Sequence, residues 1–242
     1  MPKGGTPMAT PTTRSKPSGS HQAGRRQTDS RPHTSGSRKA PRRRRRKRQF
    51  PLIPVIGFLC FLVVAGLIMN LTTLGQMLKL GRDHVPRWVD VQILAETSGG
   101  RRMEKLEGVE DIAIHYVGNP GSTAQQNHDF FDQPETQVSA HFLVGLDGEI
   151  IQCIPMDERS AATNDRNINT ISIEVCHPDA TGQFNQATYD ALVKLTAWLC
   201  DYCDIGRDHV IRHYDVTGKP CPLYFVDHPD AWEQFLADVK RY

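Results

Sequence analysis

A histidine and a cysteine near the C-terminus have the types and the spacing of ligands for a zinc ion. His213 ends a short expected strand, and Cys221 follows eight positions later in the segment R-H-Y-D-V-T-G-K-P-C-P. The intervening turn lets one imidazole and one thiolate converge, as a tetrahedral Zn²⁺ site requires. A third ligand must come from elsewhere, which leaves the fourth position for water. His115, on an expected strand before a glycine-rich turn, is the best candidate, and His141 in S-A-H-F-L-V competes with it.

The other cysteines give no comparable pattern. Cys200 and Cys203 form a C-x-x-C pair, which alone could indicate a metal or redox site. They lie near the end of an expected amphipathic helix, however, and no second pair of similar spacing accompanies them. We therefore interpret them as core thiols, and Cys153 and Cys176, which fall in expected strands, as packing residues.

Hydrophobic periodicity predicts strands and helices that are interleaved in the part of the chain that carries these residues. In D-I-A-I-H-Y-V, Ile112, Ile114 and Tyr116 share one face and His115 lies on the other, as in a strand. Asp147-Gly148 between two apolar runs is a hairpin signal. We therefore expect an α/β (α+β) fold, a mixed central β-sheet flanked by helices. The expected strands are 111–117, 138–146, 149–154, 170–176 and 209–213, and the expected helices are 123–131, 185–202 and 229–241.

Five segments of this region resemble those of a known family. The chain resembles the type 2 N-acetylmuramoyl-L-alanine amidases, which are related to the phage amidase-lysozymes and the peptidoglycan recognition proteins. The resemblance extends from about Trp88 to the C-terminus, and the segments occur in family order. It implies an amidase-like fold and a zinc enzyme that hydrolyses the amide between the lactyl group of N-acetylmuramic acid and the L-Ala of the stem peptide. The segments are I-A-I-H-Y-V-G-N-P-G (112–121), V-S-A-H-F-L-V (138–144), D-G-E-I-I-Q-C-I-P (147–155), N-D-R-N-I-N-T-I-S-I-E-V-C (164–176) and H-Y-D-V-T-G-K-P-C-P (213–222).

The same resemblance assigns roles to individual residues. It makes His115, His213 and Cys221 the zinc ligands, places Lys219 beside the site, and makes Glu174 the catalytic glutamate of one branch of the family. Zn²⁺ brings the pKa of a bound water to about 7 and polarises a carbonyl oxygen. Glu174 would then take a proton from that water and pass it to the departing nitrogen. Lys219 would stabilise the oxyanion.

The sequence departs from the phage branch at Ala140, where that branch has a tyrosine that helps catalysis. It is similar instead to the branch with S-x-H before an aromatic residue, in which the glutamate has the main acid–base role. His141 is then a packing or outer residue rather than a ligand. The pattern by itself also allows Glu174 to be an exposed strand carboxylate and Lys219 a solvated loop residue.

Polar residues around the expected ligands are candidates for supporting roles. Asp215 could orient His213 or its loop by hydrogen bonding. Others could line a groove for sugar or peptide, and Arg166 could hold a carboxylate of the stem peptide. Polar loop residues are more often merely solvated. The groove candidates are Asn119, Asn164, Asp165 and Arg166.

Charge divides the 242-residue chain into two opposed parts. Residues 1–49 hold 15 of the 29 Lys and Arg against one acidic residue, Asp29, a net charge of +14. They contain no Ile, Leu, Val, Phe, Trp, Tyr or Cys, so nothing can offset the cost of ordering the backbone, roughly 1–2 kcal/mol per residue. We therefore expect a disordered tail there. The other 193 residues hold 14 basic and 26 acidic groups, a net charge of −12.

Phe50 to Met69 are 20 consecutive residues without a charge. As a helix this stretch reaches ~30 Å, the thickness of the hydrocarbon core of a bilayer. The basic block Arg42–Arg48 precedes it, so the positive-inside rule predicts a cytoplasmic N-terminus and a domain outside the cell membrane. A cleaved signal peptide is the alternative, but the run is longer than a usual h-region and no clear A-x-A site follows it. We interpret it as an uncleaved single-pass signal anchor.

These observations predict four segments. They are a basic cytoplasmic tail (1–49), a membrane-spanning helix (50–70), a polar stalk (71–87) and a zinc amidase domain (88–242). The tail is interpreted first as a topology signal and second as a ligand for anionic lipid. Nucleic acid is disfavoured as a partner because the tail has no aromatic residue to stack on a base.

Three functions are compatible with the sequence. The first is a membrane-anchored peptidoglycan hydrolase of the amidase type. The second is a domain that binds muropeptides without cutting them; non-catalytic relatives often lack the cysteine ligand, whereas Cys221, Lys219 and Glu174 are all present here. The third is a zinc amidase or peptidase that acts on a different amide.

Overall fold

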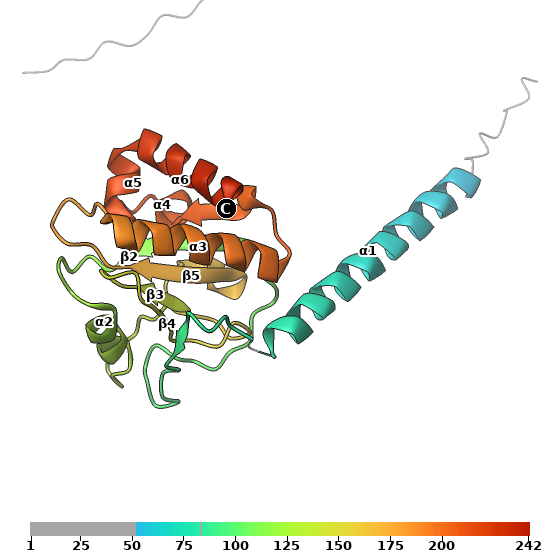
Figure 1. Cartoon of the computed structure of the whole chain (residues 1–242). Helices are drawn as coiled ribbons and strands as arrows, with labels where there is room; N and C mark the ends of the chain where they lie inside the picture. Colours follow the sequence, from blue (N-terminus) through green and yellow to red (C-terminus); the bar gives the residue numbers. More distant parts are fainter. Residues whose placement is uncertain (1–51, 83) are drawn as a thin grey trace, which may run out of the picture. The chain divides into compact units, whose positions relative to one another are not determined.

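The computed structural model of the chain describes residues 52–82 and 84–242. The expected basic tail, 1–49, lies outside the described residues and stays a prediction. In the described part, an N-terminal helix precedes an α/β domain built on one six-stranded sheet (Figure 1).

The sheet is mixed, as the sequence predicts. Its strand order is β1-β4-β3-β5-β2-β6, and β3 and β4 form its antiparallel pair while the other neighbours run parallel. The hairpin at Asp147-Gly148 is confirmed, with Gly148 at a φ of 81° that favours glycine. The strands are β1 Asp90–Val91, β2 Asp111–Tyr116, β3 Phe142–Val144, β4 Ile150–Gln152, β5 Thr170–Val175 and β6 Val210–Arg212.

All five predicted strands are shorter than the sequence pattern suggests, and β3, β4 and β6 keep only three residues each. The apolar run 138–146 contributes only Phe142–Val144 to the sheet, because the backbone before it turns away: Ser139 N–H donates to the carbonyl of Ala161 at 3.3 Å. At the β6 edge of the sheet, His213 does not end a strand. It is the first residue of a short helix, α4 (His213–Thr217), which follows β6 directly.

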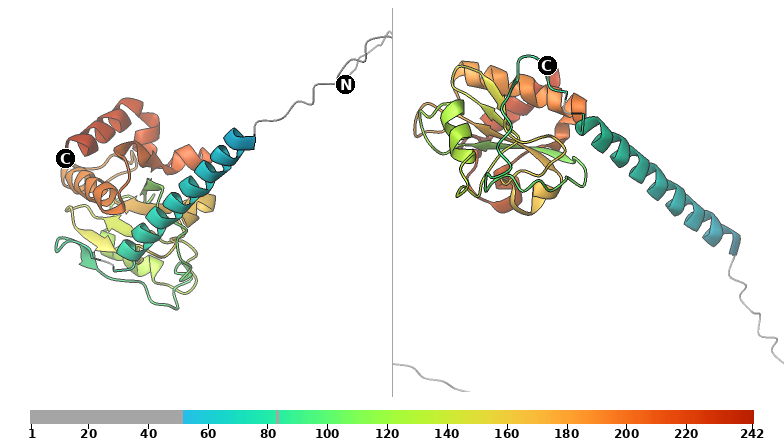
Figure 2. Two further views of the ribbon diagram at one scale, coloured as in Figure 1. Left: turned by 90° about the vertical axis from the view of Figure 1, so that its right-hand side faces the viewer. Right: turned by 90° about the horizontal axis from the view of Figure 1, so that it is seen from below.

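The two faces of the sheet carry different helices (Figure 2). On one face the isoleucines of β2 and β5 pack with α3 (Gln186–Cys203) and α6 (Pro229–Arg241) in the larger hydrophobic core. On the other face Leu143 packs with residues of α2 (Ala124–Phe131) in a smaller core. Strand alternation therefore directs His115 and Glu174, which are offset by one residue from those isoleucines, toward the α2 face.

The chain's own polar residues define the helix ends. Asn185 Oδ1 accepts from Thr188 N–H at 3.0 Å and caps the start of α3. Thr123 and Gln126 form a reciprocal capping box at the start of α2. Short helical segments complete the order: η1 (Asn164–Ile168), η2 (Arg207–His209), α4 and α5 (Leu223–Asp227).

The N-terminal helix α1 runs from Leu52 to Leu80. It is the one helix of residues 52–82 and 84–242 that is long and apolar enough to cross a membrane. Its large apolar side chains from Val55 to Leu78 are exposed, apart from Met77, which packs against the larger core. The helix continues into the segment expected as a polar stalk, since Leu71, Leu74, Met77 and Leu78 keep apolar side chains in each turn. At its end Gln76 accepts from Val109 N–H at 2.9 Å and donates to the carbonyl of Cys203 at 2.7 Å.

Candidate metal centre

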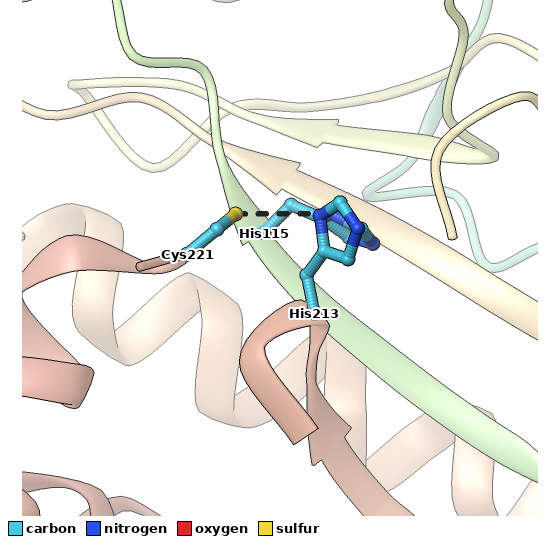
Figure 3. Close-up of side chains that lie close together, drawn as sticks. All are labelled: His115, His213 and Cys221. Atoms are coloured by element: carbon cyan, nitrogen blue, oxygen red, sulfur yellow. Dashed lines mark hydrogen bonds between the residues drawn. The ribbon is translucent and has the colours of Figure 1, made fainter. Parts of the chain in front are cut away.

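His115, His213 and Cys221 converge on one buried point (Figure 3). Their candidate ligand atoms all lie within 4.8 Å of one another, and Cys221 Sγ lies 3.8 Å from His115 Nδ1. The three residues are 1%, 5% and 2% exposed, respectively. The structure thus brings together the three residues that the sequence predicts as metal ligands, although they come from positions up to 106 residues apart.

His141, the competing candidate, has its ring nitrogens engaged elsewhere. Its Nδ1 accepts from Ser172 N–H at 3.0 Å, and its Nε2 donates to the carbonyl of Glu158 at 2.9 Å. The ring is fully buried, which lowers its pKa to about 4. His141 therefore packs between β5 and the 158–160 loop as a neutral imidazole.

The segment 212–221 is folded so that His213 and Cys221 face each other. Asp215 accepts from Arg212 N–H at 2.8 Å and so caps the start of α4, where His213 is the first residue. The helix ends at Thr217, and the next residue, Gly218, turns the chain back with a φ of 75°. Tyr214 N–H then donates to the carbonyl of Cys221 at 2.9 Å, which closes the loop. Asp215 thus organises the loop of His213 and does not hydrogen-bond its ring.

Each histidine of the group has its outer ring nitrogen occupied. His115 Nε2 lies 3.1 Å from Thr163 Oγ1, and His213 Nε2 lies 2.8 Å from Asn164 Oδ1. The amide oxygen of Asn164 only accepts, so Nε2 of His213 is the donor, and the Thr163 hydroxyl can accept from Nε2 of His115 in the tautomer that leaves Nδ1 for the centre. This is the arrangement expected for histidine ligands, whose second nitrogen donates to an oxygen acceptor.

Glu174 lies beside the group on the neighbouring strand. Its Oε1 is 3.9 Å from His115 Nδ1, and its side chain is 17% exposed. Within the described part of the chain, its buried Oε2 has no hydrogen-bond partner. Burial raises the pKa of this carboxyl to about 8, and the positive charge of Lys219 acts in the opposite direction. A carboxyl with a pKa in this range can both accept and release a proton near neutrality.

Burial and charge also set the protonation of the candidate ligands. Burial, followed by the charges of His213 and Lys219, holds the pKa of His115 well below its usual value. Burial and Lys219 lower the pKa of His213 as well. Both imidazoles are therefore neutral near pH 7, as metal ligands must be. Burial and the nearby carboxylate of Glu174 raise the pKa of the Cys221 thiol to about 12.

A cavity of about 440 Å³ opens over this group. The three candidate ligands, Glu174 and Lys219 all line it, together with Asn119, one of the predicted groove residues. Across from them the wall is formed by α2 and its flanks, where Phe130 is 56% and Val138 47% exposed. The further lining residues are Tyr116, Val117, Gln126, Asn127, Phe131, Ala161 and Ala162.

Comparison with known proteins agrees with this geometry. Residues 105–223, which include all five of these site residues, match the family described as N-acetylmuramoyl-L-alanine amidase. Over these residues, 119 of the 242 in the chain, the sequence is similar to this family. It is 28% identical over 157 residues to the amidase BlyA of Bacillus subtilis and 30% identical over 152 residues to the amidase CwlL of Bacillus licheniformis. Each alignment covers 56% of this chain and 42% of the relative, so the chain spans less than half the length of either.

The amidase domain also has the fold of solved relatives. A mutant endolysin from Bacillus subtilis superimposes with a TM-score of 0.55 at 25% sequence identity, covering 62% of this chain and 97% of the endolysin chain. The mixed sheet with flanking helices is thus the amidase-like fold that the sequence motifs predict.

Two predicted groove residues of the amidase domain are engaged elsewhere. Asn164 hydrogen-bonds His213, as described above. Arg166 forms an ion pair with Asp111 at the start of β2, and it also contacts Glu110 at 3.2 Å and Asn169 at 2.8 Å. Neither residue lines the cavity over the candidate ligands.

Sequence reasoning missed two residues that the structure places at this site. Thr163 hydrogen-bonds His115, but a threonine in a polar loop gives no signal of such a role until the fold brings it there. Phe130 belongs to the amphipathic pattern of α2, and its exposure at the cavity wall is a property of the tertiary structure.

Proposed function

We propose that this chain is a membrane-anchored, zinc-dependent peptidoglycan hydrolase that cleaves the amide bond between N-acetylmuramic acid and the L-Ala of the stem peptide. One observation carries the proposal: a His, His, Cys group, a buried glutamate and a lysine all line one cavity in a domain of the amidase family. A domain that only binds muropeptides has no need for this combination.

The donor set fits a zinc ion. Two neutral imidazoles and one thiolate are ligands that Zn²⁺ prefers, and three protein ligands leave a coordination position open, as in catalytic zinc sites. His115, His213 and Cys221 would hold the ion. When bound, Zn²⁺ polarises the substrate carbonyl and lowers the pKa of a water.

Glu174 is proposed as the general base and then the general acid. Its Oε2, which has no hydrogen-bond partner among the residues that the structure describes, can take a proton from the water that attacks the carbonyl carbon. As the C–N bond breaks, the same oxygen returns this proton to the L-Ala nitrogen, which leaves as an amine, while the lactyl group leaves as a carboxylic acid. The raised pKa of Glu174, about 8, keeps both directions of proton transfer accessible near neutral pH.

Lys219 is proposed to stabilise the negative charge that develops on the carbonyl oxygen. It lies on the wall of the cavity, two residues before Cys221, and its backbone carbonyl accepts from Cys221 N–H at 2.7 Å. A fixed positive charge is more effective in a partly enclosed cavity than in water, because solvent screens it less. Asn119 lines the same cavity and is proposed to contact the substrate.

Helix α1 is proposed to anchor the amidase domain outside the cell membrane. Its length and its exposed apolar side chains support this role, and the basic block Arg42–Arg48 supports a cytoplasmic N-terminus. The residues after the basic tail carry a net charge of −12, so we expect substrate recognition to depend on the cavity rather than on attraction to anionic wall polymers.

Digestion of purified peptidoglycan by the full chain in detergent, with added Zn²⁺, tests the enzymatic proposal. We expect free stem peptides with an N-terminal L-Ala, identified by mass spectrometry. Cys221→Ser should abolish their release, whereas the matched variant Cys60→Ser, in the exposed apolar helix, should cleave at the wild-type rate. Retention of muropeptide without release of product would instead favour the non-catalytic binding function.

Protease accessibility tests the topology. In intact protoplasts, protease added outside should degrade the amidase domain and spare an epitope placed before Arg42. Protection of the amidase domain, or its release into the medium with a new N-terminus near residue 70, would contradict the anchored arrangement.

A further inference from the structure

Two adjacent residues in one loop contact both histidines of the candidate metal centre. Thr163 Oγ1 lies 3.1 Å from His115 Nε2, and Asn164 Oδ1 lies 2.8 Å from His213 Nε2. Thr163 is fully buried. The histidines come from β2 and α4, which are almost a hundred positions apart, so a single dipeptide joins two distant parts of the chain at the point where they must be aligned.

Hydrogen bonds within the loop hold the backbone at this dipeptide. Asn167 Oδ1 accepts from Thr163 N–H at 2.6 Å and from Ala162 N–H at 3.1 Å, which holds the backbone entering η1. Asn164, the first residue of η1, has a φ of 54°, in the left-handed region that asparagine tolerates better than most residues. The amide oxygen of Asn164 therefore reaches His213 from a backbone conformation that few other side chains adopt without strain.

We propose that Thr163 and Asn164 are the positioning residues of the zinc centre, which set the tautomer and the ring orientation of both histidine ligands. The amide oxygen of Asn164, which can only accept, keeps the proton on Nε2 of His213, and the Thr163 hydroxyl does the same for His115 when it accepts from Nε2. The Nδ1 lone pairs are then directed at the centre. The inference rests on the zinc function proposed above and adds a role for two residues that do not touch the metal. Their hydrogen bonds reach both rings, whose centroids are 4.7 Å apart.

This role differs from the one that the sequence predicts for Asn164, namely binding of substrate. A substrate contact would affect the KM and leave the affinity for metal unchanged. A positioning residue would affect the affinity for metal even when no substrate is present. The geometry favours the second, because Asn164 bonds His213 and does not line the cavity.

Zinc affinity of the full chain in detergent, measured by competition with a chromophoric chelator, tests the proposal. Asn164→Gly removes the acceptor but keeps the left-handed backbone accessible, so it isolates the hydrogen bond from backbone strain. We expect its zinc dissociation constant to rise about 10- to 100-fold. Asn164→Asp, which keeps an acceptor oxygen, should stay within about threefold of wild type, and so should Asp165→Asn, the matched control at the next, exposed position.

A second pair of variants tests the other half of the dipeptide. Thr163→Val keeps the shape and removes the hydroxyl, and Thr163→Ser restores it. Weaker zinc binding by the valine variant, rescued by serine, supports the proposal, as does an altered thiolate-to-metal absorption band when Co²⁺ replaces zinc. Thermal unfolding of the metal-free variants reports whether they fold.

Three results would contradict the proposed positioning role of Thr163 and Asn164. Zinc affinity of folded Asn164→Gly and Thr163→Val equal to wild type would remove the positioning role and leave the proposed enzyme intact. A raised KM for Asn164→Gly with unchanged metal affinity would make Asn164 a substrate contact. Absence of zinc binding by the wild-type chain would instead refute the proposed metal function and this inference together.

Discussion

His115 and Glu174 are register partners on the neighbouring parallel strands β2 and β5, and His115 Nδ1 lies 3.9 Å from Glu174 Oε1. Paired residues of adjacent strands point to the same face of a sheet, so this proximity follows from backbone pairing alone. The pairing of β2 with β5 thereby fixes the positions of a candidate ligand, His115, and the candidate base, Glu174. The remaining ligands, His213 and Cys221, approach from the loop that contains α4.

Substitution of Glu174 by Gln should separate catalysis from metal binding. The amide has nearly the shape of the carboxylic acid but cannot accept the water proton, so we expect kcat to fall about 10²- to 10⁴-fold. Zinc content and thermal stability should stay close to wild type, because Glu174 is not one of the three candidate ligands. Rates of L-Ala-terminated peptide release, with Glu233→Gln on the exposed face of α6 as the control, provide the measurement. A Glu174→Gln variant as active as wild type would remove this residue from the mechanism.

Zinc binding should release protons in a way that depends on pH. In the metal-free protein the thiol of Cys221 has a pKa of about 12 and the carboxyl of Glu174 a pKa of about 8, so both hold their protons at pH 7. If zinc binding ionises both groups, the logarithm of the apparent association constant rises by about 2 per pH unit below about pH 7.5 and by about 1 above about pH 9. The histidines do not contribute there, since their lowered pKa values leave them neutral.

Calorimetric titrations in buffers of different ionisation enthalpy measure this proton release. The Glu174→Gln variant should show a slope of about 1 over the whole range, because only the thiol proton is then displaced. An apparent affinity independent of pH between about 7 and 9 would argue against Cys221 as a thiolate ligand.

The sequence predicts the sheet well because strand alternation is a local pattern, whereas the candidate ligand set comes from the family resemblance and stays a prediction. Alternation in 111–117 and 170–176 places His115 and Glu174 on one face, and the structure confirms the strands and their pairing. Spacing alone, however, leaves His115 and His141 as alternatives. The hydrogen bonds of the ring nitrogens distinguish the two histidines. Both nitrogens of His141 are bonded to residues distant in sequence, Ser172 and the carbonyl of Glu158.

The predicted groove residues show that local sequence patterns do not determine which side chains pair in the folded chain. Arg166 was a reasonable candidate for binding a carboxylate, but the fold supplies one from within the chain, at Asp111, 55 positions away. The strand expected at 209–213 ends one residue early, because Asp215 caps a helix that begins at His213. Both differences arise from side-chain contacts that periodicity does not encode.

Substitution of Arg166 by Gln should therefore reduce stability and not substrate binding. Its partner Asp111 is 11% exposed and would keep the ring of His209, at 3.1 Å, as a side-chain partner. Because Arg166 itself is 33% exposed, solvent screens the pair, and we expect a loss of about 1–2 kcal/mol in the free energy of unfolding. Chemical denaturation of the variant measures this loss, and steady-state kinetics should give an unchanged KM. A raised KM with wild-type stability would return Arg166 to the substrate groove.

Substitution of Phe235 by Ala should destabilise the α3–α6 side of the domain. The ring is fully buried, and its centroid lies 5.3 Å from that of Phe225 and 5.4 Å from that of Trp232. Loss of a buried phenylalanine leaves a cavity and costs about 3–5 kcal/mol. Zinc affinity measured below the unfolding transition should be unchanged, since the site lies on the opposite face of the sheet. Phe130→Ala, an exposed aromatic at the cavity wall, is the matched control and should leave stability near wild type.

Substitution of Lys219 should affect the rate and its pH dependence together. Lys219→Met removes the charge proposed to stabilise the oxyanion, so we expect kcat to fall about 10²- to 10³-fold with a smaller change in KM. The charge of Lys219 also lowers the pKa of Glu174, so its removal raises that pKa and shifts the acidic limb of the kcat profile toward higher pH. Lys219→Arg keeps the positive charge, so the acidic limb of its kcat profile should stay at the wild-type pH. Its kcat should lie between those of Lys219→Met and the wild type. An unshifted limb and a wild-type kcat in Lys219→Met would show that this lysine is only a solvated residue of the loop, because a charge that acts on the reaction must also act on the neighbouring carboxyl.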